Sequence, residues 1–352
     1  MIRCSLCPRR CRIAGGAEGR CHVRRARMAP QVHQVSVDDS PGFVLELPYY
    51  GCISALAADP IEKKPLYHWR PGSSIVSAGF VGCNFHCPFC QNWRISQITG
   101  GETGGSCLKP EELIAKVKAG SKDRQIAYTY SEPLVHAEYL CDCMEEAHGE
   151  GIANVLVTNG CVSAGAAEEI LSRTDAANID LKCFSQKNYS AVLGGNLEAV
   201  LDFIHLAVST GVHTEITTLV VPDLNDSEAE LMKIAEFIAG MSRVIPWHLS
   251  AYHPDWKWNA PPTEPAFLSA IAENAQDLLA FVYTGNIAGT HNDTACQRCG
   301  AKLVTRRGYR CDASGLCLQT SQKENDESLA NKKKPVFYTC AACGEAAPIR
   351  WN

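Results

Sequence analysis

Short apolar stretches alternate with segments of helical hydrophobic spacing between residues 74 and 286. The stretches are continuous apolar or β-branched runs, as expected for strands that are covered on both faces. Helical spacing is clearest at 197–208 and at 231–238, where it follows the helix start signal at 225–227. We predict seven strands, at 75–80, 125–129, 153–158, 177–181, 214–221, 244–249 and 280–284.

This alternation over about 210 residues predicts an α/β fold with a parallel sheet, arranged as a full or partial (β/α) barrel. Ligands of such barrels bind at the C-terminal ends of the strands. We therefore expect the functional side chains to lie directly after the predicted strands.

Composition gives no sign of a membrane or an exported protein. The apolar share is 46%, the charged share 20% and the formal net charge −5, which gives the whole chain no attraction to nucleic acid or anionic membrane. No apolar run approaches the roughly 18 residues that a membrane helix needs. The N-terminus lacks the apolar core of a signal peptide. We expect a cytoplasmic protein.

Cysteine is the unusual component, with 19 in 352 residues. Several form C-x2-C pairs, which in a reducing compartment indicate metal thiolates rather than disulfides. Their grouping predicts a Cys-rich N-terminal segment over 1–45, a barrel domain over 46–290 and a zinc-ribbon-like C-terminal module over 291–352.

Cys83, Cys87 and Cys90 form a C-x3-C-x2-C loop directly after the first predicted strand. Three thiolates can hold three irons of a [4Fe–4S] cluster, and the missing fourth leaves one iron open to a small chelating molecule. A zinc site of these cysteines with His86 is the alternative. We favour the cluster, because His86 adjoins Cys87 and the two side chains would diverge.

The C-x3-C-x-aromatic-C spacing, with Phe89 as the aromatic residue, resembles the signature of the radical S-adenosylmethionine (SAM) superfamily. The resemblance implies that Cys83, Cys87 and Cys90 bind the cluster and that its open iron binds the amino and carboxylate groups of SAM. It also implies that the reduced cluster cleaves SAM to a 5′-deoxyadenosyl radical. An electron donor such as flavodoxin or ferredoxin is then an expected partner.

Further resemblances fall at the ends of the predicted strands. The Tyr-Ser-Glu that ends the second strand resembles the Gly-Gly-Glu motif of the superfamily. Thr-Asn-Gly, Asp-Leu-Lys and Tyr-His motifs follow later strands. The resemblance implies that all four motifs contact SAM. Two glycines are replaced in the first motif, and Val157 replaces an Asp that pyruvate formate-lyase-activating enzymes use at a cation site. The residues so implied are Phe89, Ser131, Glu132, Thr158, Asn159, Asp180, Lys182 and His253.

Most of residues 1–290 resembles the radical SAM enzymes of the AmmeMemoRadiSam system, which are similar to pyruvate formate-lyase-activating enzymes. The resemblance rests on the cysteine pattern at 4–24, the Asp-Pro-Ile-Glu-Lys-Lys-Pro-Leu-Tyr-His run at 59–68 and the Gln-Asn-Trp-Arg-Ile-Ser run at 91–96. It implies an association with Memo-type or AMMECR-type proteins but supplies no substrate. Our first hypothesis is an enzyme that installs a radical on a protein partner. Modification of RNA or of a small molecule is the alternative within the enzyme class.

The two terminal cysteine groups have the spacing of metal sites. Cys4, Cys7, Cys11 and Cys21 suit a tetrathiolate site, for which we favour zinc over an auxiliary iron–sulfur cluster. At the other end, we predict a split zinc ribbon that consists of Cys296, Cys299, Cys340 and Cys343. Cys311 and Cys317 are alternatives to its second pair, Cys340 and Cys343. A non-catalytic zinc protein that binds nucleic acid through such ribbons is the alternative outside the enzyme class.

Overall fold

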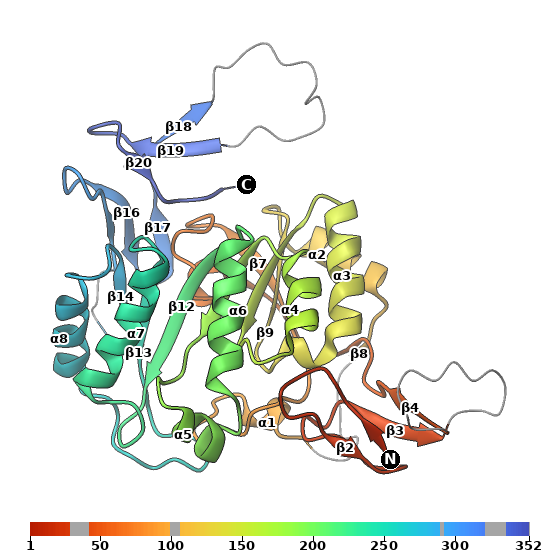
Figure 1. Cartoon of the computed structure of the whole chain (residues 1–352). Helices are drawn as coiled ribbons and strands as arrows, with labels where there is room; N and C mark the ends of the chain where they lie inside the picture. Colours follow the sequence, from red (N-terminus) through yellow and green to blue (C-terminus); the bar gives the residue numbers. More distant parts are fainter. Residues whose placement is uncertain (29–41, 99–105, 289–291, 321–335, 352) are drawn as a thin grey trace.

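The computed structural model describes residues 1–28, 42–98, 106–288, 292–320 and 336–351. At its centre is an eight-stranded sheet of strand order β14-β13-β12-β11-β10-β9-β7-β6 (Figure 1). All neighbouring strands from β7 to β14 are parallel, and β6 is antiparallel to β7. The strands are β6 (Ala55–Pro60), β7 (Ser74–Gly79), β9 (Gln125–Thr129), β10 (Ala153–Thr158), β11 (Ala176–Asp180), β12 (His213–Val220), β13 (Trp247–Ala251) and β14 (Val282–Gly285).

The predicted α/β fold is confirmed, and the sheet is an open one. Its two outer strands, β6 and β14, are not paired with each other in the described part of the chain, so the structure is a partial barrel. All seven predicted strands are present. Of these, β13 starts at Trp247 rather than at Val244, because Pro246 has no N–H for the sheet and Val244 is exposed.

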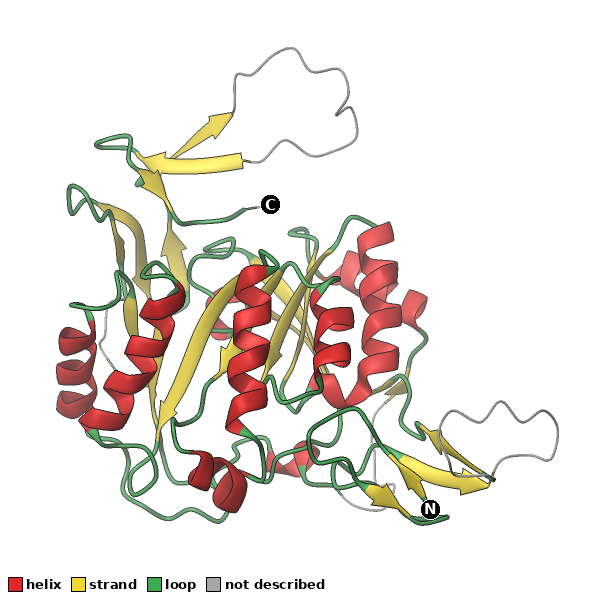
Figure 2. Cartoon of the chain, in the orientation of Figure 1, coloured by secondary structure: helices red, strands yellow, loops and turns green. Residues whose placement is uncertain are grey.

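The longer helices pack on the sheet, and Figure 2 shows α3, α4, α6 and α7 in front of it. Local signals fix where they begin: the Asn196 side chain accepts a hydrogen bond from the Ala199 N–H at the start of α6, and Ser227 caps α7. Short helices are α1 (Trp93–Ser96), η1 (Ile61–Lys63), η2 (Pro133–His136), α5 (Gln186–Asn188) and η3 (Tyr189–Leu193). The longer ones are α2 (Pro110–Gly120), α3 (Ala137–Gly149), α4 (Ala164–Leu171), α6 (Leu197–Ser209), α7 (Glu228–Met241) and α8 (Pro265–Ala275).

The C-terminal module lies at the end of the sheet where the parallel strands begin (Figure 1). The buried guanidinium of Arg306 donates to the Tyr67 carbonyl at 2.6 Å, and the Arg350 N–H donates to the His68 carbonyl at 2.8 Å. Its strands form two three-stranded sheets, β15 (Thr294–Ala295), β16 (Lys302–Arg307) and β17 (Arg310–Asp312), and β18 (Leu316–Thr320), β19 (Val336–Cys340) and β20 (Ala346–Ala347).

The N-terminal segment packs at the opposite end of the molecule (Figure 1). Arg24 forms two hydrogen bonds with Glu138 of α3, and the Ser163 N–H donates to the Leu6 carbonyl. Its small sheets pair β1 (Ile2–Arg3) with β2 (Arg12–Ile13) and β3 (Arg25–Met28) with β4 (Phe43–Glu46). A further two-stranded sheet outside this segment pairs β5 (Cys52–Ile53) with β8 (Ser106–Cys107). The predicted domain boundaries stay a prediction.

None of the described helices is by itself long and apolar enough to cross a membrane. One pair, Gln186–Leu193 with Leu197–Ser209, reaches that length and composition only when its two halves are joined across a 110° bend.

Candidate active site

A cavity of about 330 Å³ opens at the C-terminal ends of the parallel strands. It brings together all but one of the residues for which we predicted a role in the central site. These lining residues are Cys83, Cys87, Phe89, Cys90, Ser131, Glu132, Thr158, Asn159, Asp180 and Lys182. His253 is exposed and does not line the cavity, although its Nε2 lies 2.8 Å from the side-chain nitrogen of the lining residue Gln91.

The loop that carries the three cysteines turns sharply after β7. Gly82 has a φ of 78°, a left-handed conformation that favours glycine, and its N–H donates to the Ile95 carbonyl at 2.8 Å. The Cys83 sulfur accepts the Phe85 N–H at 3.3 Å, and the Cys90 Sγ lies 3.3 Å from the Ser96 hydroxyl. The backbone therefore holds the thiols toward the cavity rather than toward solvent.

Thiols in this position suit a cationic metal centre. Burial raises the pKa of the Cys87 thiol to about 12 and raises the pKa of Cys83 well above its usual range. Without a metal these buried thiols therefore stay protonated, and iron, which binds thiolates, would supply the positive charge that their deprotonation requires. Among the residues that line this cavity, only these three cysteines carry a thiol.

Glu132 is the best-connected buried carboxylate in the cavity. It follows β9 and is 1% exposed. Its Oε1 accepts the Thr158 hydroxyl at 2.6 Å and the Leu134 N–H at 3.1 Å, and its Oε2 accepts the Asn159 N–H at 2.8 Å. Burial raises the pKa of Glu132 to about 7, although these three donors act in the opposite direction.

Asp180 and Lys182 form an ion pair at the end of β11, with the Lys182 Nζ 3.1 Å from an Asp180 carboxylate oxygen. Burial by itself would lower the pKa of Lys182, but the Asp180 carboxylate and the sulfur of Cys87 raise it above its ordinary value. A permanently charged ammonium therefore stands beside the thiol loop.

Two buried hydroxyls in the cavity have no hydrogen-bond partner among the described residues, those of Ser131 and Thr217. A buried hydroxyl without a partner costs about 1–3 kcal/mol. Such groups fit a ligand that supplies the missing hydrogen bonds. Ser131 is one of the predicted residues. Thr217 lies in β12, and nothing in the sequence around it predicted a place in the site.

One wall of the cavity comes from a charged network that sequence analysis did not place at the site. Asp59 of β6 accepts hydrogen bonds from Lys64 at 2.8 Å, from Tyr130 at 2.6 Å and from Ser77 at 2.8 Å. Tyr130 has a φ of 74°, which is strained for a residue with a side chain. In the sequence, residues 59–68 were linked to a function only by a family resemblance. Their contacts with Tyr130 depend on the antiparallel pairing of β6 with β7, which joins residues that are distant in the chain.

The predicted zinc ribbon comes together in the C-terminal module. The four ligand atoms of Cys296, Cys299, Cys340 and Cys343 lie within 4.8 Å of one another, with two Sγ–Sγ distances of 3.7 Å. Of the two alternative ligands, Cys311 instead donates to Glu62 at 2.8 Å, and Cys317 is exposed on β18. This geometry favours the first of the two predicted ligand sets.

The sheet and the thiol loop at its C-terminal edge are features of a class of enzymes, and comparison with known proteins identifies that class. The sequence model of the radical SAM superfamily matches residues 79–235, from the end of β7 into α7. Together with the relatives below, this match establishes that the chain belongs to the radical SAM superfamily.

A protein of Methanocaldococcus jannaschii without an assigned function is 35% identical over 352 residues, covering 99% of this chain and 95% of that protein. The pyruvate formate-lyase-activating enzyme of Clostridium pasteurianum is 30% identical over 179 residues, covering 49% of this chain and 73% of the enzyme. A solved domain of such an enzyme from Bacteroides vulgatus has a TM-score of 0.41 and 21% identity, covering 46% of this chain and 98% of that domain. The match to the superfamily model and the Clostridium pasteurianum relative together show a radical SAM enzyme that is homologous to pyruvate formate-lyase-activating enzymes.

Proposed function

We propose that this enzyme cleaves SAM on a [4Fe–4S] cluster held by Cys83, Cys87 and Cys90, and transfers the resulting radical to a protein partner. The observation that carries the proposal is the shared cavity, in which three thiols and the polar ends of β9, β10 and β11 meet. When bound, the cluster would supply the electron that breaks a carbon–sulfur bond of SAM.

The residues around the thiol loop suit the polar groups of SAM. Glu132 presents a carboxylate for a charge-assisted hydrogen bond from an ammonium. Lys182 presents a cation for a carboxylate. The unpartnered hydroxyls of Ser131 and Thr217 add two further hydrogen-bonding groups.

Two observations favour a protein as the radical acceptor. The sheet is open between β6 and β14 in the described residues, which leaves more room at the cavity than a closed barrel would. The Clostridium pasteurianum relative is by its name an activator of another enzyme. An electron donor of the flavodoxin or ferredoxin type, Memo-type or AMMECR-type partners and a cytoplasmic location complete the proposal, and zinc is the metal we assign to the C-terminal cysteines.

The cleavage step is tested with anaerobically reconstituted protein, SAM and dithionite, with 5′-deoxyadenosine as the measured product. The acceptor is tested next with a pyruvate formate-lyase-type protein produced from α-deuterated glycine. Deuterium in the 5′-deoxyadenosine and a glycyl radical signal support a protein acceptor. Cleavage without deuterium transfer to the nucleoside, or transfer from deuterated RNA instead, contradicts that acceptor while leaving SAM cleavage intact.

A further inference from the structure

The four N-terminal cysteines surround a cavity of their own. Cys4, Cys7, Cys11 and Cys21 all line one small cavity, whose other walls come from apolar residues such as Ile13 and Val135 and from Arg9, Arg20 and Arg24. Cys4 is buried and the other three are partly buried. Four thiols from a short segment therefore line one cavity, and one of them is buried.

The spacing of these thiols differs from that of a single-ion site. Four sulfurs at about 2.3 Å from a tetrahedral zinc lie about 3.8 Å from one another. The C-terminal quartet matches this, with Sγ–Sγ distances of 3.7 Å. Throughout the described residues, that quartet is the only group of three or more Cys, His, Asp or Glu whose ligand atoms lie within 4.8 Å of one another.

The N-terminal quartet shares a cavity, but no three of its sulfurs all lie within 4.8 Å of one another, and the same holds for the three thiols of the central loop. Wider spacing is what a cubane cluster needs, because each thiolate binds a different iron at a different corner. We propose that the N-terminal cavity holds a second [4Fe–4S] cluster, ligated by Cys4, Cys7, Cys11 and Cys21. This departs from the zinc ion that the sequence spacing alone favoured.

The proposed cluster lies against the central thiol loop. A Cβ at Gly82, directly before Cys83, would lie 2.4 Å from the Cys21 carbonyl oxygen, so the two loops are in backbone contact. Asn84, directly after Cys83, lines the N-terminal cavity. The two thiol groups are therefore separated by little more than one stretch of backbone and one side chain.

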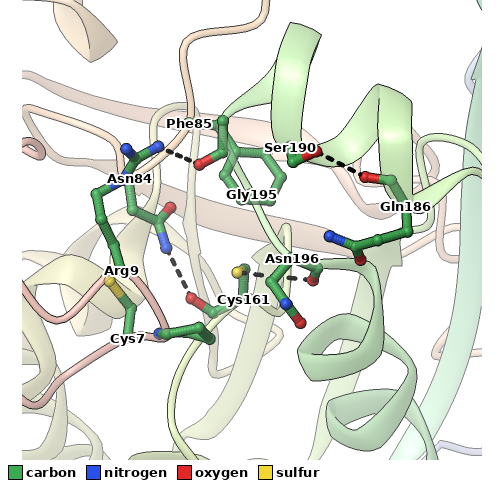
Figure 3. Close-up of a pocket in the computed structure, with 11 residues that line it drawn as sticks. Cys7, Arg9, Asn84, Phe85, Cys161, Gln186, Ser190, Gly195 and Asn196 are labelled. Carbon is green, nitrogen blue, oxygen red and sulfur yellow. Dashed lines mark hydrogen bonds between the residues drawn. The ribbon is translucent and has the colours of Figure 1, made fainter.

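Asn84 itself is fixed from both sides. Its amide donates to the Cys161 carbonyl at 2.7 Å (Figure 3). Its side-chain oxygen accepts from the Asn159 side chain at 2.9 Å. Asn159 also contacts the Cys83 sulfur at 3.8 Å. Figure 3 shows Cys7, Asn84 and Cys161 among the residues that line an adjacent pocket, which Gln186 and Asn196 also line. The hydrogen-bonded residues Asn84 and Asn159 would thus separate the two clusters and hold them side by side.

The decisive protein is the Cys83/Cys87/Cys90 triple alanine variant, which keeps the N-terminal quartet. After anaerobic reconstitution, iron, sulfide and zinc are measured in the wild type and in this variant. We expect about eight irons per chain in the wild type and about half in the variant, since each cluster has four. The variant's remaining iron should have the Mössbauer spectrum of a [4Fe–4S] cluster.

The complementary variant, Cys7→Ser with Cys11→Ser, should also lose about half of the iron, and Cys141→Ser in α3 serves as the matched control that loses none. In the fully reduced wild type, the paramagnetic resonance spectrum should show coupling between two clusters that is absent from either variant. A triple variant that holds zinc at the N-terminal site and no iron overturns the proposal. Neither result depends on SAM cleavage, which the triple variant lacks in both cases.

Discussion

The Thr158 hydroxyl donates a 2.6 Å hydrogen bond to Glu132, joining the end of β10 to the end of β9 inside the cavity. With the two backbone N–H donors, this bond fixes the orientation of a carboxylate that is 1% exposed. Glu132 therefore lies pre-oriented beside the thiol loop, rather than on a side chain that a ligand would have to order.

Changing Glu132 to Gln should weaken SAM binding while leaving the central cluster in place. The amide keeps the size of the side chain but loses the charge, and a hydrogen bond to a charged group is worth about 1.5–3 kcal/mol, or roughly tenfold to a hundredfold in affinity. The dissociation constant for SAM and the iron content are measured together. Glu145→Gln on the exposed face of α3 is the matched control. An unchanged dissociation constant for Glu132→Gln would falsify this role.

SAM binding should depend on pH near neutrality because the pKa of Glu132 is raised to about 7. Below that pH the carboxyl is protonated, so affinity should fall as the pH drops from 8 to 6, and Glu132→Gln should remove the dependence. The pH dependence of folding stability has the opposite sign. A raised pKa means that the ligand-free folded state binds the proton better than the unfolded state, so this contribution is present at low pH and lost as the pH rises through 7. Titration of binding and of thermal unfolding checks both signs.

The parts of this site that the sequence predicts are those with a local signal. Cys83, Cys87 and Cys90 follow a buried strand at fixed spacing, and the polar groups after β9, β10 and β11 are recognisable because parallel strands share one C-terminal edge. All of them line the cavity.

The parts that the sequence does not predict depend on contacts between distant residues. Asp59 reaches Tyr130 only because β6 pairs with β7, and no apolar pattern marks β6 as a strand. Thr217 looks like any β-branched strand residue until the structure shows which side of β12 faces the cavity. Whether two cysteine groups hold single ions or clusters depends on sulfur spacing in three dimensions, which residue spacing alone leaves open.

Changing Cys87 to Ala should abolish SAM cleavage and bleach the spectrum of the central cluster. Two thiolates cannot hold the three irons that the loop is expected to ligate. The product 5′-deoxyadenosine and the absorbance of the anaerobic protein are measured side by side with Cys141→Ala, a buried thiol in α3 that does not line the cavity. Full cleavage activity in Cys87→Ala would rule out the assignment of the cluster.

Changing Thr217 to Val should stabilise the ligand-free protein and weaken SAM binding. The substitution keeps the shape but removes a buried hydroxyl that has no hydrogen-bond partner in the described part of the chain. Its removal is worth about 1 kcal/mol or more in unfolding free energy. Thr218→Val is the matched control with the opposite sign. The Thr218 hydroxyl donates to the Leu181 carbonyl at 2.9 Å and accepts the Trp247 indole N–H at 3.0 Å, so its loss should destabilise the protein. Thermal unfolding and SAM affinity of the two variants are compared; a destabilised Thr217→Val would show that its hydroxyl already has a structural partner.

The C-terminal cysteines should hold one zinc ion that stabilises the module without taking part in SAM cleavage. Cys340 is 2% exposed and lies 3.7 Å from Cys299, at the spacing of a tetrahedral site. Because metal binding contributes directly to folding of such modules, Cys340→Ser should lose the zinc and lower the unfolding temperature. Cys317→Ser, on the exposed side of β18, should lose neither.

The position of this module explains why the chemistry should survive. The C-terminal module lies at the end of the sheet where the strands begin (Figure 1), whereas the cavity lined by the thiol loop lies where they end. Cys340→Ser should therefore keep its [4Fe–4S] absorbance and its rate of 5′-deoxyadenosine formation at temperatures below unfolding. Zinc analysis, thermal unfolding and the cleavage rate are measured on the same preparation. A variant that loses cleavage while its module stays folded would mean that the C-terminal cysteines act on the chemistry itself.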